Sequence, residues 1–499
     1  MSALDRPIRR VGYAVIGLML VLVVQLVHLQ VVDSKKLTDD PQNIRKTIRD
    51  FARPRGKILT VDGQVVAQSV VAPDQFRRQR QYLLGDPAGS LFAGVTGYFS
   101  FIFGTTGIEN TYNDWLAGRK TTELALNSPG DFLTGQDLVG DVVMSLDSRV
   151  QQAARDALGD RQGSVLVMNA RTGAMVAMYS NPTYDPNALA GHDYDRTQAI
   201  FTFLNALPTN PLLMRAYRER FPPGSTFKIV TTTSALDFNV ATPTEPDYPK
   251  VRSIGLPDTT AELNNFGGKR CGGNLTESFI ESCNTTFGMI GLQLGNNLAV
   301  GNAKWGIGVS QEAPPIDLPS AASSIGPVFG TFERNKPAFA QAAIGQNEVA
   351  TTPLQMLLTA AGIANGGVVM APHTVQEIKG PDGKVVKTIE PQVWKTATSP
   401  ETAATITEMM LGVVQHGTGT AAAIPGVAVA GKTGTAQTVA GARPHAWFVG
   451  FAPANAPADQ PVYAFAVLVE NAGSNQNEAT GGAVAAPIAK AVLAPLLGR

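Results

Sequence analysis

The first long stretch of the chain without charge is strongly apolar. No charged residue occurs from Val11 to Val32, and at about 1.5 Å per residue a helix of this length spans a hydrocarbon core about 30 Å thick. A cleaved signal peptide is the alternative, but the run is long for one and no small-x-small cleavage site closes it. Residues 1–10 carry three arginines and Asp33 follows the run, which favours a cytoplasmic N-terminus. We predict one uncleaved anchor at residues 11–32, with residues 1–10 in the cytoplasm and residues 33–499 outside it.

After the anchor, short apolar runs alternate with turn residues. Residues 55–67 predict a β-hairpin, because apolar positions lie on either side of an Asp-Gly turn. Residues 141–147 predict a strand, and Ser148 is then placed to cap a helix over residues 149–158. We assign residues 33–150 to a separate β-rich module.

A second pattern begins at Gly163, where two apolar strands flank an Arg-Thr-Gly turn. Strands and helices are then expected in a fixed order. The strands are 164–169, 174–179, 427–431, 446–452 and 463–470, and the helices are 225–236, 276–294, 352–365 and 484–497. Strands at both ends with helices between them indicate an antiparallel sheet covered by helices. We predict a multi-domain α+β protein in which residues 151–499 form the second domain.

Composition excludes several classes of protein. The 499 residues are 44% hydrophobic, which is enough to build packed cores, and 40 Lys and Arg balance 40 Asp and Glu. Nucleic-acid binding would call for a clustered basic excess, so it is not expected. Two cysteines and five scattered histidines do not suggest a zinc site, and we expect neither a metal nor a cofactor.

A serine and a lysine one helical turn apart form the first chemical motif. Proline and glycine break the backbone just before Ser225, and an apolar run of helical length follows. Ser225 should therefore lie at or near a helix N-terminus, with Lys228 on the same face. A lysine that burial or a nearby cation holds neutral is able to take the proton of a serine nucleophile. On its own, such a pair is more often a solvated surface pair.

Two further motifs follow along the chain. Ser282 and Asn284 lie two residues apart, inside a predicted helix or at its start, so both reach a cleft only if the backbone is irregular. A cap or turn is the ordinary explanation. The segment Lys432–Thr435, with the sequence KTGT, lies at the end of an apolar strand. It places a cation and hydroxyls where a backbone edge can approach a ligand closely, which suits a carboxylate.

Residues 426–433 also match the pattern of a nucleotide phosphate loop. A phosphate loop needs a flexible turn after a strand and a helix after its Lys-Thr pair. Here the four residues between the glycines look like the strand itself, and residues 434–439 are a poor helix start. The site would also face away from the cytoplasmic nucleotide pool. We therefore disfavour nucleotide binding.

The three motifs resemble, in type and order, those of the penicillin-binding protein and serine β-lactamase superfamily. Other segments are similar to class B penicillin-binding proteins, and these are Arg55–Ile58, Gly107–Tyr112, Thr172–Met178, Pro182–Asn187, Gly345-Gln346, Thr352–Gln355 and Trp447–Pro453. The likeness extends from about Arg53 to near the end of the chain. It implies a single-pass D,D-transpeptidase that cross-links peptidoglycan stem peptides outside the cell during division or in keeping cell shape, and that β-lactams inhibit.

The resemblance implies roles for the first two motifs. Ser225 would attack the D-Ala-D-Ala carbonyl and form an acyl-enzyme, and Lys228 would be the base that activates it. Ser282 would relay a proton to the departing D-Ala. Asn284 would bind the peptide amide of the substrate.

The third motif would hold the terminal carboxylate of the substrate through Lys432, Thr433, Gly434 and Thr435. The backbone N–H groups of Ser225 and Thr435 would form the oxyanion hole. If the motifs converge, the charge of Lys432 would also help to keep a buried Lys228 neutral.

The resemblance also implies partners. These are stem peptides as D-Ala-D-Ala donor and amine acceptor, β-lactam antibiotics, the membrane, and a glycosyltransferase or a protein of the division or elongation machinery. The last would dock on the transmembrane helix and on the first module, which would be a pedestal or a dimerisation-like domain. Three alternatives stay open: a D,D-carboxypeptidase with water as acceptor, a β-lactam sensor, and a non-catalytic scaffold of the cell-wall machinery.

The two cysteines lie close to the second motif. Cys283 is the middle residue of Ser-x-Asn, and Cys271 lies 12 residues earlier in a Gly-rich loop. In an oxidising compartment a disulfide between them is plausible. We hypothesise that it ties this loop to the cleft and holds Ser282 and Asn284 in place. Two buried free thiols are the alternative.

Overall fold

The computed structural model describes residues 5–29, 51–120, 138–308, 311–326, 335–437, 443–472 and 480–499. The chain divides into two compact units. One comprises Met1–Pro54 with Val71–Gln79, and the other comprises Arg55–Val70 with Arg80–Arg499.

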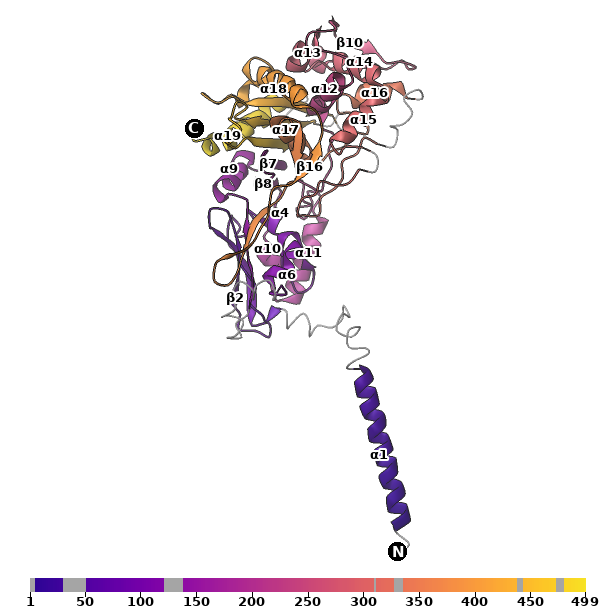
Figure 1. Cartoon of the computed structure of the whole chain (residues 1–499), viewed down its shortest axis with the longest axis vertical. Coiled ribbons are helices and arrows are strands. Elements are labelled where there is room, and N and C mark those ends of the chain that lie inside the picture. Colours follow the sequence, from indigo (N-terminus) through magenta and orange to yellow (C-terminus); the bar gives the residue numbers. More distant parts are fainter. Residues whose placement is uncertain are drawn as a thin grey trace. The chain divides into compact units, whose positions relative to one another are not determined.

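The first unit contains the apolar helix α1, Asp5–Val27 (Figure 1). Within it, residues 10–27 have a mean hydropathy of 2.1 and none of these side chains is buried, so α1 is long and apolar enough to cross a membrane. The helix begins before Val11, inside the predicted tail. Residues 30–32 of the predicted span lie outside the described residues, as does Asp33.

A six-stranded sheet forms the base of the second unit, in the order β15-β14-β6-β1-β2-β3. The predicted hairpin is confirmed, because β1 and β2 pair antiparallel and Gly63 in the turn between them has φ of +81°. The strands are β1 Ile58–Leu59, β2 Val65–Val71, β3 Arg78–Tyr82, β6 Asp141–Met144, β14 Val375–Lys379 and β15 Val385–Thr388. Strand β14 pairs with β6, so a hairpin from far along the chain completes this sheet (Figure 1).

Short elements connect β3 to β6, and the helix after β6 begins one residue earlier than predicted. The short elements are α4 Ala93–Thr96, β4 Phe99–Ser100, β5 Gly104–Thr105, α5 Gly107–Thr111 and α6 Asn113–Leu116. In α9, Ser148–Leu158, the cap is Asp147, whose carboxylate accepts from the N–H of Arg149. The prediction that Ser148 caps this helix was wrong, because its hydroxyl donates to Asp62 in the hairpin turn at 2.6 Å.

A five-stranded antiparallel sheet in the order β17-β18-β19-β7-β8 forms the centre of the second predicted domain. Helices α9 and α19 pack on one face, and α17, which is buried along almost its whole length, packs on the other (Figure 1). This confirms the predicted sheet covered by helices. The elements are β7 Gly163–Asn169, β8 Met175–Asn181, β17 Ala430–Ala436, β18 His445–Ala452, β19 Tyr463–Val469, α17 Pro353–Ala364 and α19 Ala486–Leu496, with a π-turn at Gly481–Ala485 before α19.

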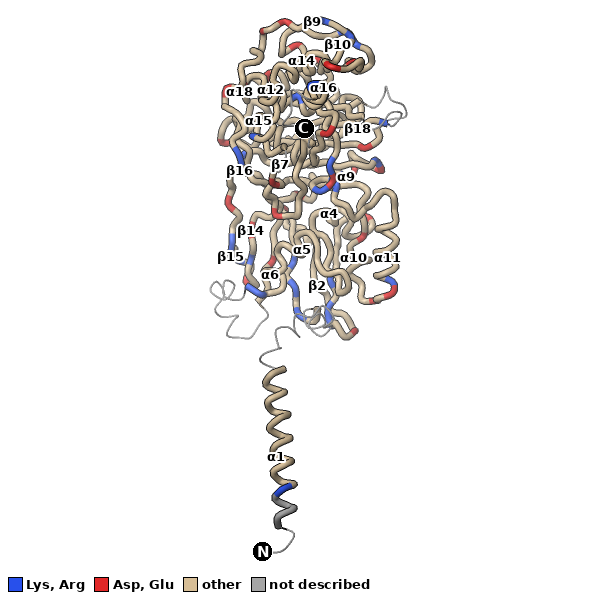
Figure 2. The backbone as a smooth tube through the Cα atoms, turned by 90° about the vertical axis from the view of Figure 1, so that its right-hand side faces the viewer, with Lys and Arg blue, Asp and Glu red and all other residues tan. Residues whose placement is uncertain are grey.

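Helices and small ribbons complete the unit. The helices are α10 Pro186–Leu189, α11 Tyr194–Ala206, α12 Lys228–Asp237, α13 Leu275–Glu281, α14 Asn284–Leu294, α15 Asn297–Lys304, α16 Lys336–Ala342 and α18 Pro400–Gln415, with 3₁₀ turns at Gly224–Phe227, Phe266–Gly268 and Thr420–Ala422. The ribbons are β9 Tyr248–Val251 with β12 Cys271–Gly273, β10 Ser253–Gly255 with β11 Glu262–Asn264, and β13 Val368–Met370 with β16 Val393–Thr396. Basic and acidic residues are interspersed over the second unit (Figure 2).

The predicted single helix over 276–294 was wrong. Helix α13 ends at Glu281, and Ser282 adopts a left-handed conformation with φ of +62°. The N–H groups of Ser282 and Cys283 donate back to Phe279 and Ser278, a pattern that closes a helix and usually has glycine at the left-handed position. Helix α14 then starts afresh at Asn284, so the backbone between Ser282 and Asn284 is irregular.

Candidate active site

Ser225 lies on a 3₁₀ turn, Gly224–Phe227, that leads directly into α12. The predicted position at a helix start is therefore confirmed. Gly224 has φ of +54°, and a Cβ added there would lie 2.6 Å from the carbonyl oxygen of Thr435 on β17. Only glycine lets the serine turn approach the KTGT strand this closely.

Lys228 is fully buried one turn after Ser225. Its Nζ donates to the carbonyl oxygen of Ser282 at 2.7 Å and to Asn284 Oδ1 at 2.8 Å, and it lies 3.2 Å from Ser282 Oγ. The irregular backbone between α13 and α14 makes this possible, because it turns both Ser282 and Asn284 toward the same ammonium group.

Lys432 approaches the same serine from β17. Its Nζ donates to Ser282 Oγ at 2.9 Å and to the carbonyl oxygen of Thr433 at 3.0 Å, and its side chain is fully buried. Ser282 Oγ thus lies between the two lysines. The structure brings these residues of all three motifs into one hydrogen-bonded network.

Burial changes the charge state of both lysines. It lowers the pKa of Lys432 to about 7. Burial, and then the neighbouring charge of Lys432, lower the pKa of Lys228 well below its usual value. Neither lysine has a carboxylate partner among the residues that the structure describes, so nothing opposes these shifts. Both effects favour the neutral amine form of Lys228.

The motif residues open onto a cavity of about 570 Å³. Ser225, Ser282, Asn284, Thr433 and Thr435 line it. The hydroxyl of Ser225 makes no hydrogen bond within the described part of the chain, so it is not bonded to Lys228 here. Such bonds often tighten only when a substrate is bound.

The KTGT segment lies inside β17 and not after it. Strand β17 starts at Ala430, so the predicted bounds 427–431 were wrong. Residues 427–429 precede the strand, and Lys432–Thr435 belong to it. Gly434 does not line the cavity; a Cβ there would lie 2.8 Å from Thr226 Cγ2. A strand in place of a loop followed by a helix also removes the basis for the phosphate-loop alternative.

Strand β17 is an edge strand, so alternate backbone groups point away from β18. The carbonyl oxygen of Thr435 faces Gly224. Because the N–H and C=O of one residue in an antiparallel strand point to the same side, the N–H of Thr435 also points toward the serine turn.

Sequence reasoning missed two residues beside the motifs. Asn265 is buried, accepts from the N–H of Thr285 at 3.0 Å and donates to Thr285 Oγ1 and to Val251, which fixes the start of α14. Thr418, which lines the cavity, bonds to Thr433. Both reach the site from segments distant in sequence, and no local pattern marks them.

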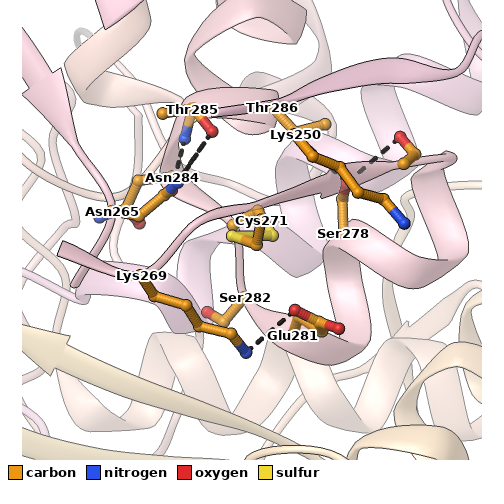
Figure 3. Close-up of a disulfide and its surroundings, with 12 residues drawn as sticks. Lys250, Asn265, Lys269, Cys271, Ser278, Glu281, Ser282, Asn284, Thr285 and Thr286 are labelled. Atoms are coloured by element: carbon orange, nitrogen blue, oxygen red, sulfur yellow. Dashed lines mark hydrogen bonds and ion pairs between the residues drawn. A yellow bond between two sulfur atoms is a disulfide. The ribbon is translucent and has the colours of Figure 1, made fainter. Parts of the chain in front are cut away.

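Cys271 and Cys283 form a disulfide, with Cα atoms 5.8 Å apart. It joins β12 to the turn that carries Ser282 (Figure 3). Beside it Lys269 and Glu281 form an ion pair at 2.9 Å. The ligand atoms of Cys271, Glu281 and Cys283 lie within 4.8 Å of one another, but sulfurs joined in a disulfide offer this group no thiolate for a metal.

A serine one turn before a buried lysine of lowered pKa, a second lysine on an edge strand and a sheet covered by helices define a class of acylating serine enzyme. The chain belongs to the penicillin-binding protein transpeptidase family: residues 163–494 match the penicillin binding protein transpeptidase domain. Residues 55–143 match the penicillin binding protein A dimerisation domain.

Among particular proteins, the chain is similar to the peptidoglycan D,D-transpeptidase PbpA of Mycolicibacterium smegmatis, with 39% identity over 99% of each chain. PbpA of Mycobacterium tuberculosis is 38% identical over 98% of each chain. Two solved structures of penicillin-binding protein A from M. tuberculosis share the fold. The penicillin G acyl-enzyme has a TM-score of 0.80 and 38% identity, covering 89% of this chain and 100% of that one. The imipenem acyl-enzyme has a TM-score of 0.80 and 37% identity, covering 90% and 100%.

Proposed function

We propose that this chain is a peptidoglycan D,D-transpeptidase that works through an acyl-enzyme on Ser225. The observation that carries the proposal is the network of Lys228, Ser282, Asn284 and Lys432 beside Ser225, in a cavity large enough for a peptide end. Family membership and the D,D-transpeptidase names of the two PbpA relatives support it. The substrates are a stem peptide ending in D-Ala-D-Ala and a second stem peptide that supplies an amine.

Acylation begins with Lys228 as the base. Its lowered pKa favours the neutral amine, whose lone pair takes the proton of Ser225 as Oγ bonds to the carbonyl carbon of the penultimate D-Ala. The N–H groups of Ser225 and Thr435 stabilise the oxyanion, a role that the direction of the Thr435 peptide supports. Asn284 holds the substrate amide with its free amide hydrogen, because its other contacts run to Lys228 and to the carbonyl oxygen of Asn264.

Ser282 completes the proton path. When the C–N bond to the terminal D-Ala breaks, the departing nitrogen takes a proton from Ser282 Oγ, which Lys228 replaces from 3.2 Å away. In the second half, the acceptor amine attacks the ester and gives up its proton by the same path in reverse. The ester bond to Ser225 breaks, and Oγ regains its proton.

Lys432, Thr433 and Thr435 hold the substrate carboxylate. A charged Lys432 has three N–H donors and uses two of them within the described protein, on Ser282 and Thr433, so one is left for an anion. Burial makes that contact stronger than it would be in water.

The topology of the chain follows from this function. We propose that α1 is a single anchor with residues 1–10 in the cytoplasm and the catalytic domain, residues 151–499, outside the cell. The three arginines before the apolar run support this orientation. Residues 33–150 and the anchor would dock a glycosyltransferase or a protein of the division or elongation machinery, so that cross-linking follows strand synthesis.

Covalent labelling with a fluorescent penicillin tests the proposal. The full-length chain in detergent should give a labelled band, Ser225→Ala should give none, and Ser69→Ala, a control on strand β2 that does not line the cavity, should label like the wild type. Label that persists in Ser225→Ala would contradict the assignment. An assay with a donor and an acceptor stem peptide then separates cross-linking from simple release of D-Ala, and release alone would favour a carboxypeptidase.

A further inference from the structure

Thr418 lies in the turn between α18 and the 3₁₀ turn at Thr420–Ala422, and it faces β17. Its Oγ1 is 2.6 Å from Oγ1 of Thr433, and both residues line the cavity that holds Ser225. Thr418 belongs to none of the three motifs. It is a hydroxyl that contacts the KTGT segment from outside.

The backbone around Thr418 is packed too tightly to move freely. A Cβ added at Gly417 would lie 2.8 Å from the carbonyl oxygen of Ile280 and from the Cα of Val413. A Cβ added at Gly482 would overlap the carbonyl oxygen of Thr418 itself. The N–H of Gly419 donates to Val413 at 2.9 Å. This packing therefore holds the backbone of Thr418 in place, while its exposed side chain reaches Thr433 at the cavity wall.

The protons of the two hydroxyls decide what this contact does. Each threonine hydroxyl has one proton to donate, whereas a carboxylate only accepts. If Thr433 donated to Thr418, it would have no proton left for an anion. If Thr418 donates to Thr433, the Thr433 proton is free to point into the cavity, and the two bonds in series strengthen each other.

We propose that Thr418 is a positioning residue, which orients the Thr433 hydroxyl as a donor to the carboxylate of the substrate or of a β-lactam. This proposal rests on the proposed function, because it assigns a partner to the carboxylate-binding end of the same site. Among the described residues no hydrogen bond joins Lys432 to the Thr433 hydroxyl, because the Lys432 Nζ donates to the backbone carbonyl of Thr433 instead. Among the described residues, Thr418 is the side chain that hydrogen-bonds to this hydroxyl.

The test is the acylation of full-length protein by a penicillin and by its methyl ester, which lacks the anion. The variants are Thr418→Val, Thr418→Ser and, as a matched control, Thr420→Val, whose side chain is exposed and does not line the cavity. Thr418→Val should lower the second-order acylation constant for the acid about tenfold, mainly through weaker non-covalent binding. Thr418→Ser and Thr420→Val should stay within about twofold of the wild type, since each keeps the bond.

The ratio of acid to ester rates makes the test independent of how much protein is folded. Thr418→Val should lower this ratio about tenfold, and in a Thr433→Val background it should lower it no further. An unchanged ratio, or equal losses in both backgrounds, would overturn the role of Thr418 while leaving the acyl-enzyme intact. If wild-type protein is not acylated at all, the proposed function falls and this inference with it.

Discussion

In the base of the second unit the carboxylate of Glu109 lies between the guanidinium groups of Arg55 and Arg80, whereas the ammonium groups of Lys228 and Lys432 face no carboxylate among the described residues. Both contacts of Glu109 are 2.6 Å long, and all three side chains are buried. Burial would raise the pKa of Glu109, but the two arginines outweigh it and hold this pKa below its usual value.

The two clusters therefore use burial in opposite ways. Around Glu109 each charge has a partner, so the cluster keeps its charges and links strands and helices of the base. Around Ser282 two lysine amines share neutral acceptors and have no counter-charge, so burial lowers the pKa of both lysines. A buried charge paired with its counter-charge indicates a structural role. Buried lysines without a counter-charge indicate a site that binds an anion and accepts a proton.

Replacing Lys228 should break the catalytic cluster with the largest effect. Lys228→Met removes the base, so acylation by a fluorescent penicillin should fall about 10⁴-fold, equivalent to about 5.4 kcal/mol. The free energy of unfolding, measured in urea, should change by less than about 1 kcal/mol, because a buried lysine without a counter-charge gives little stability. A variant that unfolds, or that still acylates at near the wild-type rate, would contradict this contrast.

Replacing Glu109 should do the reverse. Glu109→Ala leaves two buried guanidinium groups without a counter-charge, and we expect the free energy of unfolding to fall by about 3–5 kcal/mol. The acylation rate per folded molecule should stay within about twofold of the wild type, since no contact joins Glu109 to the described cavity. Exposed Glu408→Ala, on α18 and outside the cavity, is a control for stability. A stable Glu109→Ala would show that the arginines do not depend on this carboxylate.

Much of the fold was predictable from local pattern. The hairpin of β1 and β2, the strands β7, β8, β18 and β19 and the last helix follow from apolar periodicity and turn residues, which report burial directly. Strand β17 was displaced in the prediction because an apolar run marks burial and not pairing. Residues 427–429 are apolar but precede the strand. The KTGT segment pairs with β18, and its residues are polar because the other edge of the strand faces the cavity.

The residue types of the site were predictable, but the hydrogen bonds between them were not. The sequence alone identifies the nucleophile, base and polar side chains of Ser225, Lys228, Ser282, Asn284 and Lys432. The break at Ser282 was not visible, because serine rather than glycine takes the left-handed position. Nor does the sequence show that Lys228 bonds to the Ser-x-Asn turn instead of to Ser225, since that depends on burial and on acceptors 54 and 56 residues away.

The pH dependence of acylation tests most directly whether Lys228 is the base and Lys432 binds the carboxylate. Lys228 must be neutral to accept a proton, and its lowered pKa favours this form. Lys432 must be charged to hold a carboxylate, and with a pKa of about 7 it loses that charge as the pH rises. The second-order acylation constant should therefore fall about tenfold per pH unit above about pH 7, and Lys432→Met should lack this decline. A constant that instead keeps rising toward pH 10, as for a base lysine of ordinary pKa, would contradict the account.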